Sequence, residues 1–198
     1  MTEIEFYFDF LSPYSYLAYR LARVHFKKFN LILKPISLPH IINLSGNVPP
    51  ASLKVRGKFL LKDLKRSAEF YGLNQEHGDF KVPDKFPFDT RNHLYELVKM
   101  IEEEGRTFEE IDKFVMSVWI KIFHKGEIGV GPELPNKSHW KNLILENTEK
   151  ALQLGAFGVP FWRITNDEGE IETFFGSDRF HHMAKFIRID PLPFYSKL

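Results

Sequence analysis

The chain has 198 residues, of which 43% are hydrophobic and 15% aromatic, enough for one packed domain or one domain with a large insertion. Its 27 lysines and arginines balance 26 acidic residues, so no net charge attracts nucleic acid or an anionic membrane surface. It has no cysteine, which excludes disulfides, thiolate metal sites and a cysteine nucleophile.

The first part of the chain combines strand and helix patterns. Residues 3–10 alternate in polarity and are rich in aromatics, which predicts a strand. Apolar spacing over residues 13–29 predicts a helix packed on one side, and residues 30–38 predict a second, buried strand. Strand, helix and strand within about 35 residues form a βαβ unit with a right-handed crossover. The Gly-Asn and Pro-Pro pairs of residues 39–52 predict an irregular loop.

Helical periodicity dominates the middle of the chain. It predicts helices at residues 54–71, 90–104, 108–124 and 138–154. Because four successive helices exceed what can flank a small sheet, we expect an inserted helical domain over residues 54–150. After Gly155, the patterns "VPFWRIT" and "EIETFFG" predict a hairpin, and a last helix is expected from about Asp178 to Ile189.

These elements predict an α/β protein with a thioredoxin-like fold, in which a large all-helical insertion separates a βαβ half from a ββα half. Residues 1–53 and 151–198 would form the thioredoxin-like domain. Chemistry in this arrangement lies at the start of the first helix and at the turn before the third strand. Ser12, followed by proline, stands at the first place, where serine is a typical helix N-cap. Val159-Pro160 stands at the second, as an ordinary turn or a candidate cis peptide bond.

Ser177 and Asp178 follow the end of the predicted last strand at Gly176. One interpretation is that they cap the final helix. The other is that free backbone N–H groups at this helix start bind a carboxylate, while the Asp178 side chain binds an ammonium group. A ligand that carries both groups on a single carbon is an amino acid.

Four motifs in order over residues 3–190 carry a family resemblance: "FYFDFLSPYSYLA", "SGNVPP", "GAFGVP" and "FFGSDR". The chain resembles the kappa-class glutathione S-transferases of the DsbA-like thioredoxin-fold superfamily, and the bacterial 2-hydroxychromene-2-carboxylate isomerases are close relatives. The resemblance implies a homodimeric enzyme with glutathione as cosubstrate. It implies conjugation of the glutathione thiolate to small apolar electrophiles, with hydroperoxide reduction open to the same thiolate.

The resemblance also implies roles for individual residues. Ser12 is the implied catalytic residue and would hydrogen-bond the glutathione sulfur. The implied glutathione-binding residues are Asn47, Arg56 near the glycyl carboxylate, Val159 through its backbone at the cysteinyl part, and Ser177 with Asp178 at the γ-glutamyl end. Lysine is more usual than arginine at position 56. The segment "KGEIGVGPEL", residues 125–134, departs from the more acidic family pattern, so no second-substrate contact is assigned to it.

Ser12 suits this role on physical grounds. A thiol with a pKa of about 8.5 is only a few per cent ionised at neutral pH. Lowering that pKa by about two units takes roughly 2.7 kcal/mol in favour of the anion. A charge-assisted hydrogen bond contributes about 1.5 to 3 kcal/mol and a helix N-terminus about 0.3 to 1 kcal/mol. One hydroxyl at the start of a helix therefore suffices, without a general base.

Other side chains are less suited to chemistry. Tyr7 is expected in the core, and Tyr14 is expected to form a wall of the site. His40, His181 and His182 suggest no metal site, because adjacent histidines on a helix point to different faces and no carboxylate or cysteine cluster accompanies them. We therefore expect no metal.

Two other functions fit the same sequence. The first is a glutathione-dependent isomerase of the 2-hydroxychromene-2-carboxylate type, in which glutathione adds reversibly and no conjugate remains. The second is a non-catalytic thioredoxin-like binding module, which the lack of cysteine permits. For that module, the matches at Asn47 and Ser177-Asp178 would be accidental.

The chain ends in Ser196-Lys197-Leu198, a tripeptide that the peroxisomal import receptor reads at a C-terminus. No apolar run approaches the roughly 20 residues that span a bilayer, and the N-terminus enters a strand pattern without a signal or transit segment. We therefore expect a peroxisomal location, with a mitochondrial or cytoplasmic one as the alternatives, and no nucleic-acid or membrane partner.

Overall fold

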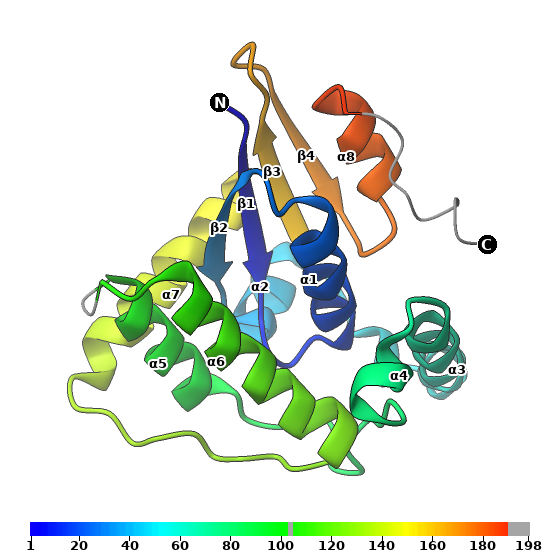
Figure 1. Cartoon of the computed structure of the whole chain (residues 1–198). Coiled ribbons are helices and arrows are strands. Elements are labelled where there is room, and N and C mark those ends of the chain that lie inside the picture. Colours follow the sequence, from blue (N-terminus) through cyan, green and yellow to red (C-terminus); the bar gives the residue numbers. More distant parts are fainter. Residues whose placement is uncertain (103–104, 190–198) are drawn as a thin grey trace.

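The computed structural model describes residues 1–102 and 105–189 (Figure 1). Its centre is a four-stranded sheet with the strand order β2-β1-β3-β4. β1, Glu3–Phe8, runs parallel to β2, Asn30–Pro35, and antiparallel to β3, Phe161–Thr165. β4, Ile171–Phe175, pairs antiparallel with β3. The four strands predicted from the sequence are confirmed, and β1 is central because it pairs on both sides.

One face of the sheet is covered by α1, Pro13–His25, and α8, Phe180–Phe186 (Figure 1). Buried aromatic rings fill the space between them. Phe6 stacks on Trp162 with ring centroids 4.3 Å apart, and Trp162 packs edge-on against Phe180 at 5.5 Å. Such pairs contribute about 0.5 to 1.5 kcal/mol beyond the burial of their area. The aromatic alternation that predicts β1 therefore also builds this layer of the core.

The opposite face is covered by α2, Leu38–Ser45, and α7, Lys137–Gln153. Because side chains alternate along a strand, Tyr7 points to this face while its neighbours point to α1. A smaller apolar cluster forms here from Tyr7, Ile36, Ile41, Ala151, Ala156, Val159 and Phe161. The expectation that Tyr7 belongs to the core is confirmed, since its side chain is fully buried.

The expectation of an irregular loop over residues 39–52 is wrong for its first half, which is α2. Pro39 lies in the first turn of this helix, where its missing N–H leaves no hydrogen bond unmade. Gly46, with φ of 70°, ends the helix in the left-handed conformation. The prolines that follow open a short 3₁₀ helix, η1, Pro50–Ser52. Residues that break helices therefore mark where α2 and η1 begin and end.

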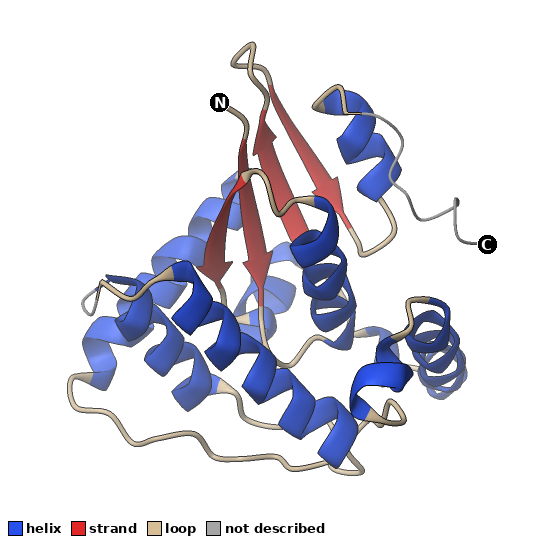
Figure 2. Ribbon diagram, in the orientation of Figure 1, coloured by secondary structure: helices blue, strands red, loops and turns tan. Residues whose placement is uncertain are grey.

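The remaining helices lie between β2 and β3 in the sequence, and in Figure 2 they lie in blue beyond the lower end of the sheet. They are α3 (Lys54–Phe70), α4 (Leu73–His77), α5 (Arg91–Glu102) and α6 (Phe108–Ile120), which continues into a π-helical turn, η2 (Lys121–Lys125). The four predicted long helices are confirmed as α3, α5, α6 and α7. The short α4 was not predicted, because five residues are too few for a periodic signal. Within the described residues, no helix is long and apolar enough to cross a membrane.

α7 packs against both the helices and the sheet. Trp140 and Ile144, in its first half, belong to the main core with α5 and α6. Ala151, near its end, belongs to the cluster beneath the sheet. The division of the chain at residue 150 stays a prediction, and α7 lies across that border.

Candidate active site

Ser12 joins β1 to α1 and is only 4% exposed. It is the N-cap of α1, as predicted: its Oγ accepts a hydrogen bond from the Ser15 N–H at 3.1 Å, and Pro13 occupies the first turn. The Ser12 hydroxyl also donates a hydrogen bond to the Val159 carbonyl at 3.3 Å. The structure thus brings together two predicted site residues that lie 147 positions apart.

The Val159-Pro160 peptide bond is cis, as the sequence suggested. Val159 is 8% exposed and lies two residues before β3, beside the start of α1. Among the hydrogen bonds of the described residues, none uses the Val159 N–H. A backbone donor next to a strand end and to a helix N-terminus can pair with an extended peptide-like ligand.

The Asn47 side chain links the loop between α2 and η1 to the loop that ends in the cis-proline. Its Nδ2 donates to the Phe157 carbonyl at 2.8 Å, and its Oδ1 accepts from the Val48 N–H at 2.8 Å. A Cβ at Gly158 would come within 3.5 Å of the Phe175 ring and 3.8 Å of Asn47 Nδ2. Asn47 therefore lies on the exposed side of the loop that ends in the cis-proline.

Ser177 and Asp178 follow β4 and approach the same loop from the other side. The Gly176 N–H donates to the Pro160 carbonyl at 3.0 Å, and Trp162 Nε1 donates to the Gly176 carbonyl at 3.1 Å. Ser177 is 9% exposed, whereas Asp178 is exposed and pairs with Arg179. Both interpretations of Ser177 and Asp178 placed the start of the last helix at these residues, and that placement is wrong, because α8 begins at Phe180 with Arg179 as its N-cap.

The Tyr14 side chain links α1 to α3. The Tyr14 hydroxyl donates to Asp63 at 2.8 Å, which joins the first turn of α1 to α3. Burial is the largest cause that raises the pKa of Tyr14. The hydrogen bond to Asp63 and the negative charge of Asp63 raise it further, and the charge of Asp178 adds to the rise. The Tyr14 hydroxyl is therefore protonated at neutral pH, with its proton directed at Asp63. Ser12 is left as the hydroxyl beside the cis-proline.

Arg56 stands apart from the other candidates. It lies in α3, two helical turns before Asp63, and is exposed. No hydrogen bond or ion pair joins it to another predicted site residue within the described part of the chain.

Asp9 is a site residue that the sequence reasoning missed. Its side chain is 1% exposed and accepts three hydrogen bonds, from Leu11 N–H at 2.9 Å, Leu38 N–H at 2.8 Å and Thr90 Oγ1 at 2.7 Å. Its backbone carbonyl accepts from the Ser12 N–H at 3.0 Å. Burial raises the pKa of Asp9 despite these donors. Asp9 therefore holds the loop that carries Ser12 and fixes it to the starts of α2 and α5.

No group of three or more histidine, aspartate or glutamate side chains is arranged to hold a metal ion in residues 1–102 and 105–189. His40 and His182 have no shared partner in the structure.

The pattern of the DsbA-like thioredoxin domain matches residues 3–128 of the chain, well over half of it. The chain belongs to this family. Its fold is also similar to two solved structures: a 2-hydroxychromene-2-carboxylate isomerase (TM-score 0.62, 23% identity, 93% of this chain and 94% of that one) and a probable DsbA oxidoreductase from Streptomyces coelicolor (TM-score 0.61, 15% identity, 97% and 93%). The predicted fold class is confirmed.

Curated relatives extend over nearly the whole chain of this DsbA-like protein. Glutathione S-transferase kappa 1 of Caenorhabditis elegans is 29% identical and covers 98% of this chain and 94% of its own. Glutathione S-transferase kappa 1 of Homo sapiens is 27% identical, with 93% and 90% covered. A 2-hydroxychromene-2-carboxylate isomerase of Pseudomonas putida is 39% identical over 74 residues, about a third of either chain. The predicted resemblance is confirmed.

The DsbA-like chain differs from a disulfide oxidoreductase in one decisive respect. Thioredoxin-like oxidoreductases exchange disulfides through a Cys-x-x-Cys motif. This chain has no cysteine, and the start of α1 reads Ser12-Pro13-Tyr14-Ser15. Any sulfur chemistry at this site therefore requires a thiol brought by a ligand.

Proposed function

We propose that the protein is a glutathione transferase of the kappa type, in which Ser12 stabilises the sulfur of glutathione as an anion. The observation that carries the proposal is the position of the Ser12 hydroxyl, at the N-terminus of α1 and within hydrogen-bond distance of the cis-proline backbone. Relatives named glutathione S-transferase kappa, aligned over more than nine-tenths of the chain, support it.

The residues around Ser12 suit a peptide-like thiol. The bond from Ser12 Oγ to the Val159 carbonyl is 3.3 Å long, against about 2.7 to 2.8 Å for most O–H···O bonds, so it is weak and the hydroxyl can rotate to another acceptor. The Val159 N–H donates to no described residue and suits the carbonyl of a peptide. The Ser12 hydroxyl and the Val159 N–H therefore fit glutathione, once the hydroxyl has rotated from the Val159 carbonyl towards the sulfur.

Bound glutathione would supply the sulfur nucleophile that the chain lacks. The Ser12 hydroxyl would donate a hydrogen bond to the sulfur anion, and the helix N-terminus would add about 0.3 to 1 kcal/mol of preference for negative charge. Pro13, which has no N–H, removes one backbone donor that would compete with the hydroxyl. Ser177 and Asp178 would hold the γ-glutamyl end, and the exposed Arg56 would reach the glycyl carboxylate.

Calorimetric titration of glutathione, followed by product analysis with aryl halides and hydroperoxides, tests this function. We expect micromolar to millimolar binding. An aryl halide should give a conjugate whose mass equals the sum of both reactants less one hydrogen halide. A hydroperoxide should instead give its alcohol and water, with two glutathione molecules oxidised to one glutathione disulfide. A protein that neither binds glutathione nor forms a product would be a non-catalytic thioredoxin-like module, which contradicts the proposal.

The isomerase is the second candidate, favoured by the 39% identity to the Pseudomonas putida isomerase over 74 residues. Both reactions would use the same Ser12 hydroxyl. They differ in outcome, since an isomerase changes its substrate without any change in mass and leaves glutathione unconsumed. Mass spectrometry of the products therefore separates the two.

Asn47→Ala should weaken glutathione binding while leaving the fold intact. The substitution removes the bond to the Phe157 carbonyl and so loosens the cis-proline loop, which we expect to raise KM for glutathione about threefold to tenfold. Since Asn47 is exposed, the free energy of unfolding should fall by less than about 1 kcal/mol.

Asn142→Ala is the matched control for Asn47, because Asn142 is also exposed but lies on α7, away from the loop. Steady-state kinetics with glutathione varied, together with thermal unfolding, measures both effects. Equal KM values for the two variants would contradict a role for Asn47 in binding.

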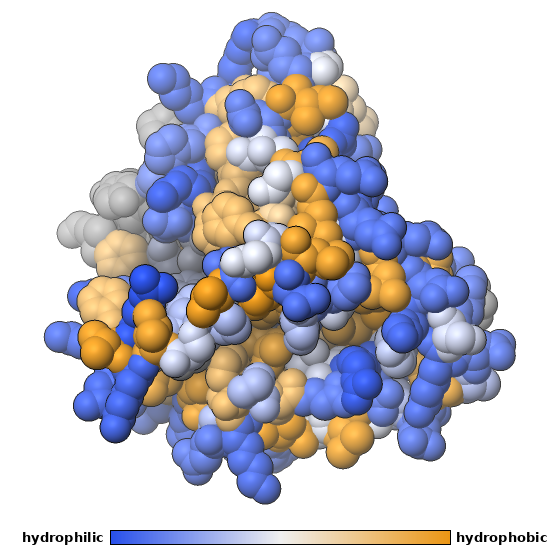
Figure 3. All heavy atoms as spheres, turned by 180° about the vertical axis from the view of Figure 1, so that it is seen from behind, coloured by the Kyte–Doolittle hydropathy of each residue, from blue (hydrophilic) through white to orange (hydrophobic). Residues whose placement is uncertain are grey.

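We also propose that the protein forms a homodimer. Apolar side chains are exposed along α3, where Val55 is 81% and Phe59 62% exposed, and they gather at one edge of the molecule in Figure 3. Apolar patches of this kind commonly mark protein interfaces. Light scattering during size-exclusion chromatography measures the mass directly, and a mass of one chain would contradict the proposal.

Finally, we propose import into peroxisomes through Ser196-Lys197-Leu198, which lies outside the described residues. A fluorescent protein fused to the N-terminus should reach peroxisomes, and removal of the last three residues should leave it in the cytoplasm. A mitochondrial or cytoplasmic signal from the intact fusion would contradict the proposal.

A further inference from the structure

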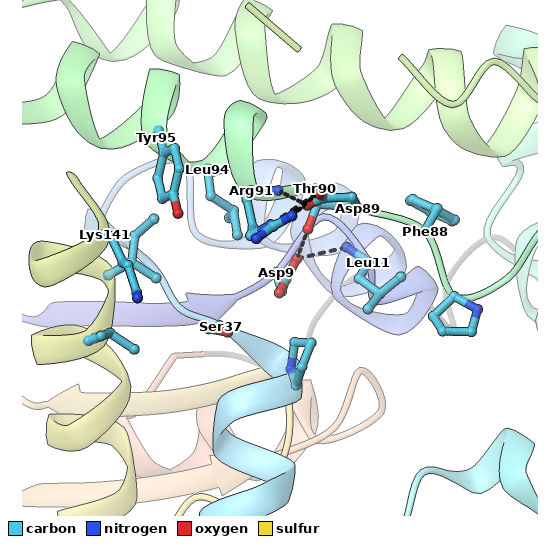
Figure 4. A pocket seen from close by; sticks show the side chains of 14 residues that line it. Asp9, Leu11, Ser37, Phe88, Asp89, Thr90, Arg91, Leu94, Tyr95 and Lys141 are labelled. Carbon is cyan, nitrogen blue, oxygen red and sulfur yellow. Dashed lines mark hydrogen bonds and ion pairs between the residues drawn. The ribbon is translucent and has the colours of Figure 1, made fainter. Parts of the chain in front are cut away.

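A cavity of about 450 Å³ lies at the C-terminal ends of β1 and β2 (Figure 4). It is bounded by the loop after β1, the starts of α2 and α5, and the side of α7. Leu11 lines this cavity, whereas the hydroxyl of the next residue, Ser12, is turned towards Val159. Its size falls within the range of about 300 to 1,000 Å³ typical of small-molecule sites.

Most of the wall is apolar. It is formed by Leu11, Pro39, Pro87, Phe88, Leu94, Ile144 and Leu145. Such a lining favours a ligand with an apolar body, since each methylene group that the ligand buries adds favourable free energy to its transfer from water.

The carboxylates in the wall already have partners. Asp9 accepts from Leu11, Leu38 and Thr90, as described above. Asp89 accepts from both the backbone N–H and the guanidinium of Arg91, in each case at 2.9 Å from Oδ1. Neither acid needs a cation or a donor from a ligand.

The donors of the cavity, in contrast, are not all used. Tyr95 is 9% exposed, yet its hydroxyl makes no hydrogen bond with a described residue. Lys141 is exposed and forms no ion pair within the described residues. Figure 4 shows Tyr95 of α5 and Lys141 of α7 at the same end of the cavity, which both residues line. Arg91, at the start of α5, also lines the cavity, where its guanidinium pairs with Asp89.

We propose that this cavity binds a small apolar carboxylate, such as an aromatic acid, at a site separate from Ser12. The ring of the ligand would pack against Leu94 and Ile144. Its carboxylate would accept from the Tyr95 hydroxyl and pair with Lys141, since donors without partners next to satisfied acceptors select for an anion.

The experiment uses 2-naphthoate as the probe and 2-naphthamide as its neutral counterpart, with both titrated calorimetrically into the full chain. Wild type should bind the acid at least about tenfold more tightly than the amide, because only the acid can make charge-assisted bonds. Lys141→Met and Tyr95→Phe should each weaken binding of the acid by about fivefold or more, and Lys141→Met should leave the amide unchanged.

Lys137→Met is the matched control, because it removes the same charge one turn earlier on α7, where Lys137 pairs with Glu133 outside the cavity. It should bind the acid as wild type does. Saturating glutathione should also leave the affinity for 2-naphthoate unchanged. No binding, equal affinity for acid and amide, equal effects of Lys137→Met and Lys141→Met, or competition by glutathione would each overturn the proposal. Since the test does not depend on activity, its failure leaves the proposed transferase function untouched.

Discussion

Ser12→Ala should lower kcat/KM for conjugation at neutral pH by about 10-fold to 100-fold, because a charge-assisted hydrogen bond to the sulfur contributes about 1.5 to 3 kcal/mol. Glutathione should still bind, since its ends are held elsewhere. The ultraviolet absorbance of the bound thiolate should disappear at neutral pH. The pKa of the bound thiol should rise towards about 8.5, so the lost activity should return in part as the pH is raised through that value.

Ser15→Ala is a matched control for this variant. Ser15 lies one turn along α1, is fully buried, and its Oγ has no hydrogen-bond partner. Its removal should leave the thiolate absorbance and kcat/KM close to those of wild type. Ser12→Ala should also lower the free energy of unfolding by about 0.5 to 2 kcal/mol, because it removes the cap of α1. Thiolate absorbance that persists in Ser12→Ala, or is lost equally in Ser15→Ala, would move the catalytic assignment away from Ser12.

Asp9→Asn should produce the largest loss of stability, about 2 to 4 kcal/mol in the free energy of unfolding. One oxygen of Asp9 accepts from Leu11 and Thr90, and the other accepts from Leu38. An asparagine has only one oxygen, so its NH₂ group faces a donor and leaves it buried without a partner, at a cost of about 1 to 3 kcal/mol. Denaturant unfolding measures the difference.

The loss in Asp9→Asn should depend on pH. Because burial raises the pKa of Asp9 in the folded state, folding takes up a proton between the unfolded value, about 3.8, and the folded one. Wild type gains stability from this group as the pH falls through the folded pKa, and the variant does not. The difference between the two proteins should therefore widen on acidification and level off below about pH 3.8.

Asp84→Asn provides the comparison, since Asp84 is an exposed acid in the connector before α5. It should change the free energy of unfolding by less than about 0.5 kcal/mol at any pH tested. An Asp9→Asn protein as stable as Asp84→Asn would mean that the three hydrogen bonds to Asp9 do not hold the loop.

The sequence predicted the sheet well because its strands carry the aromatic alternation that also forms the core. It failed at α2 because helix-breaking residues were interpreted as forbidding a helix, whereas Pro39 and Gly46 only delimit one. The family resemblance assigned Ser12 and Val159 to the same site, and the structure places the two within hydrogen-bond distance. The role of Asp9 could not be predicted, because its partners Leu38 and Thr90 lie 29 and 81 positions away and contact it only in the folded chain.

The 3.3 Å contact between the Ser12 hydroxyl and the Val159 carbonyl has a consequence for ligand entry. A hydroxyl has one proton, so it cannot donate a hydrogen bond to this carbonyl and to a sulfur anion at the same time. Arrival of an anion must exchange one acceptor for the other, and until then the Ser12 hydroxyl donates to the Val159 carbonyl. Without a ligand, the Ser12 hydroxyl is therefore hydrogen-bonded to the Val159 carbonyl. Ser12 would favour an anion only when that anion, as the stronger acceptor, replaces the carbonyl.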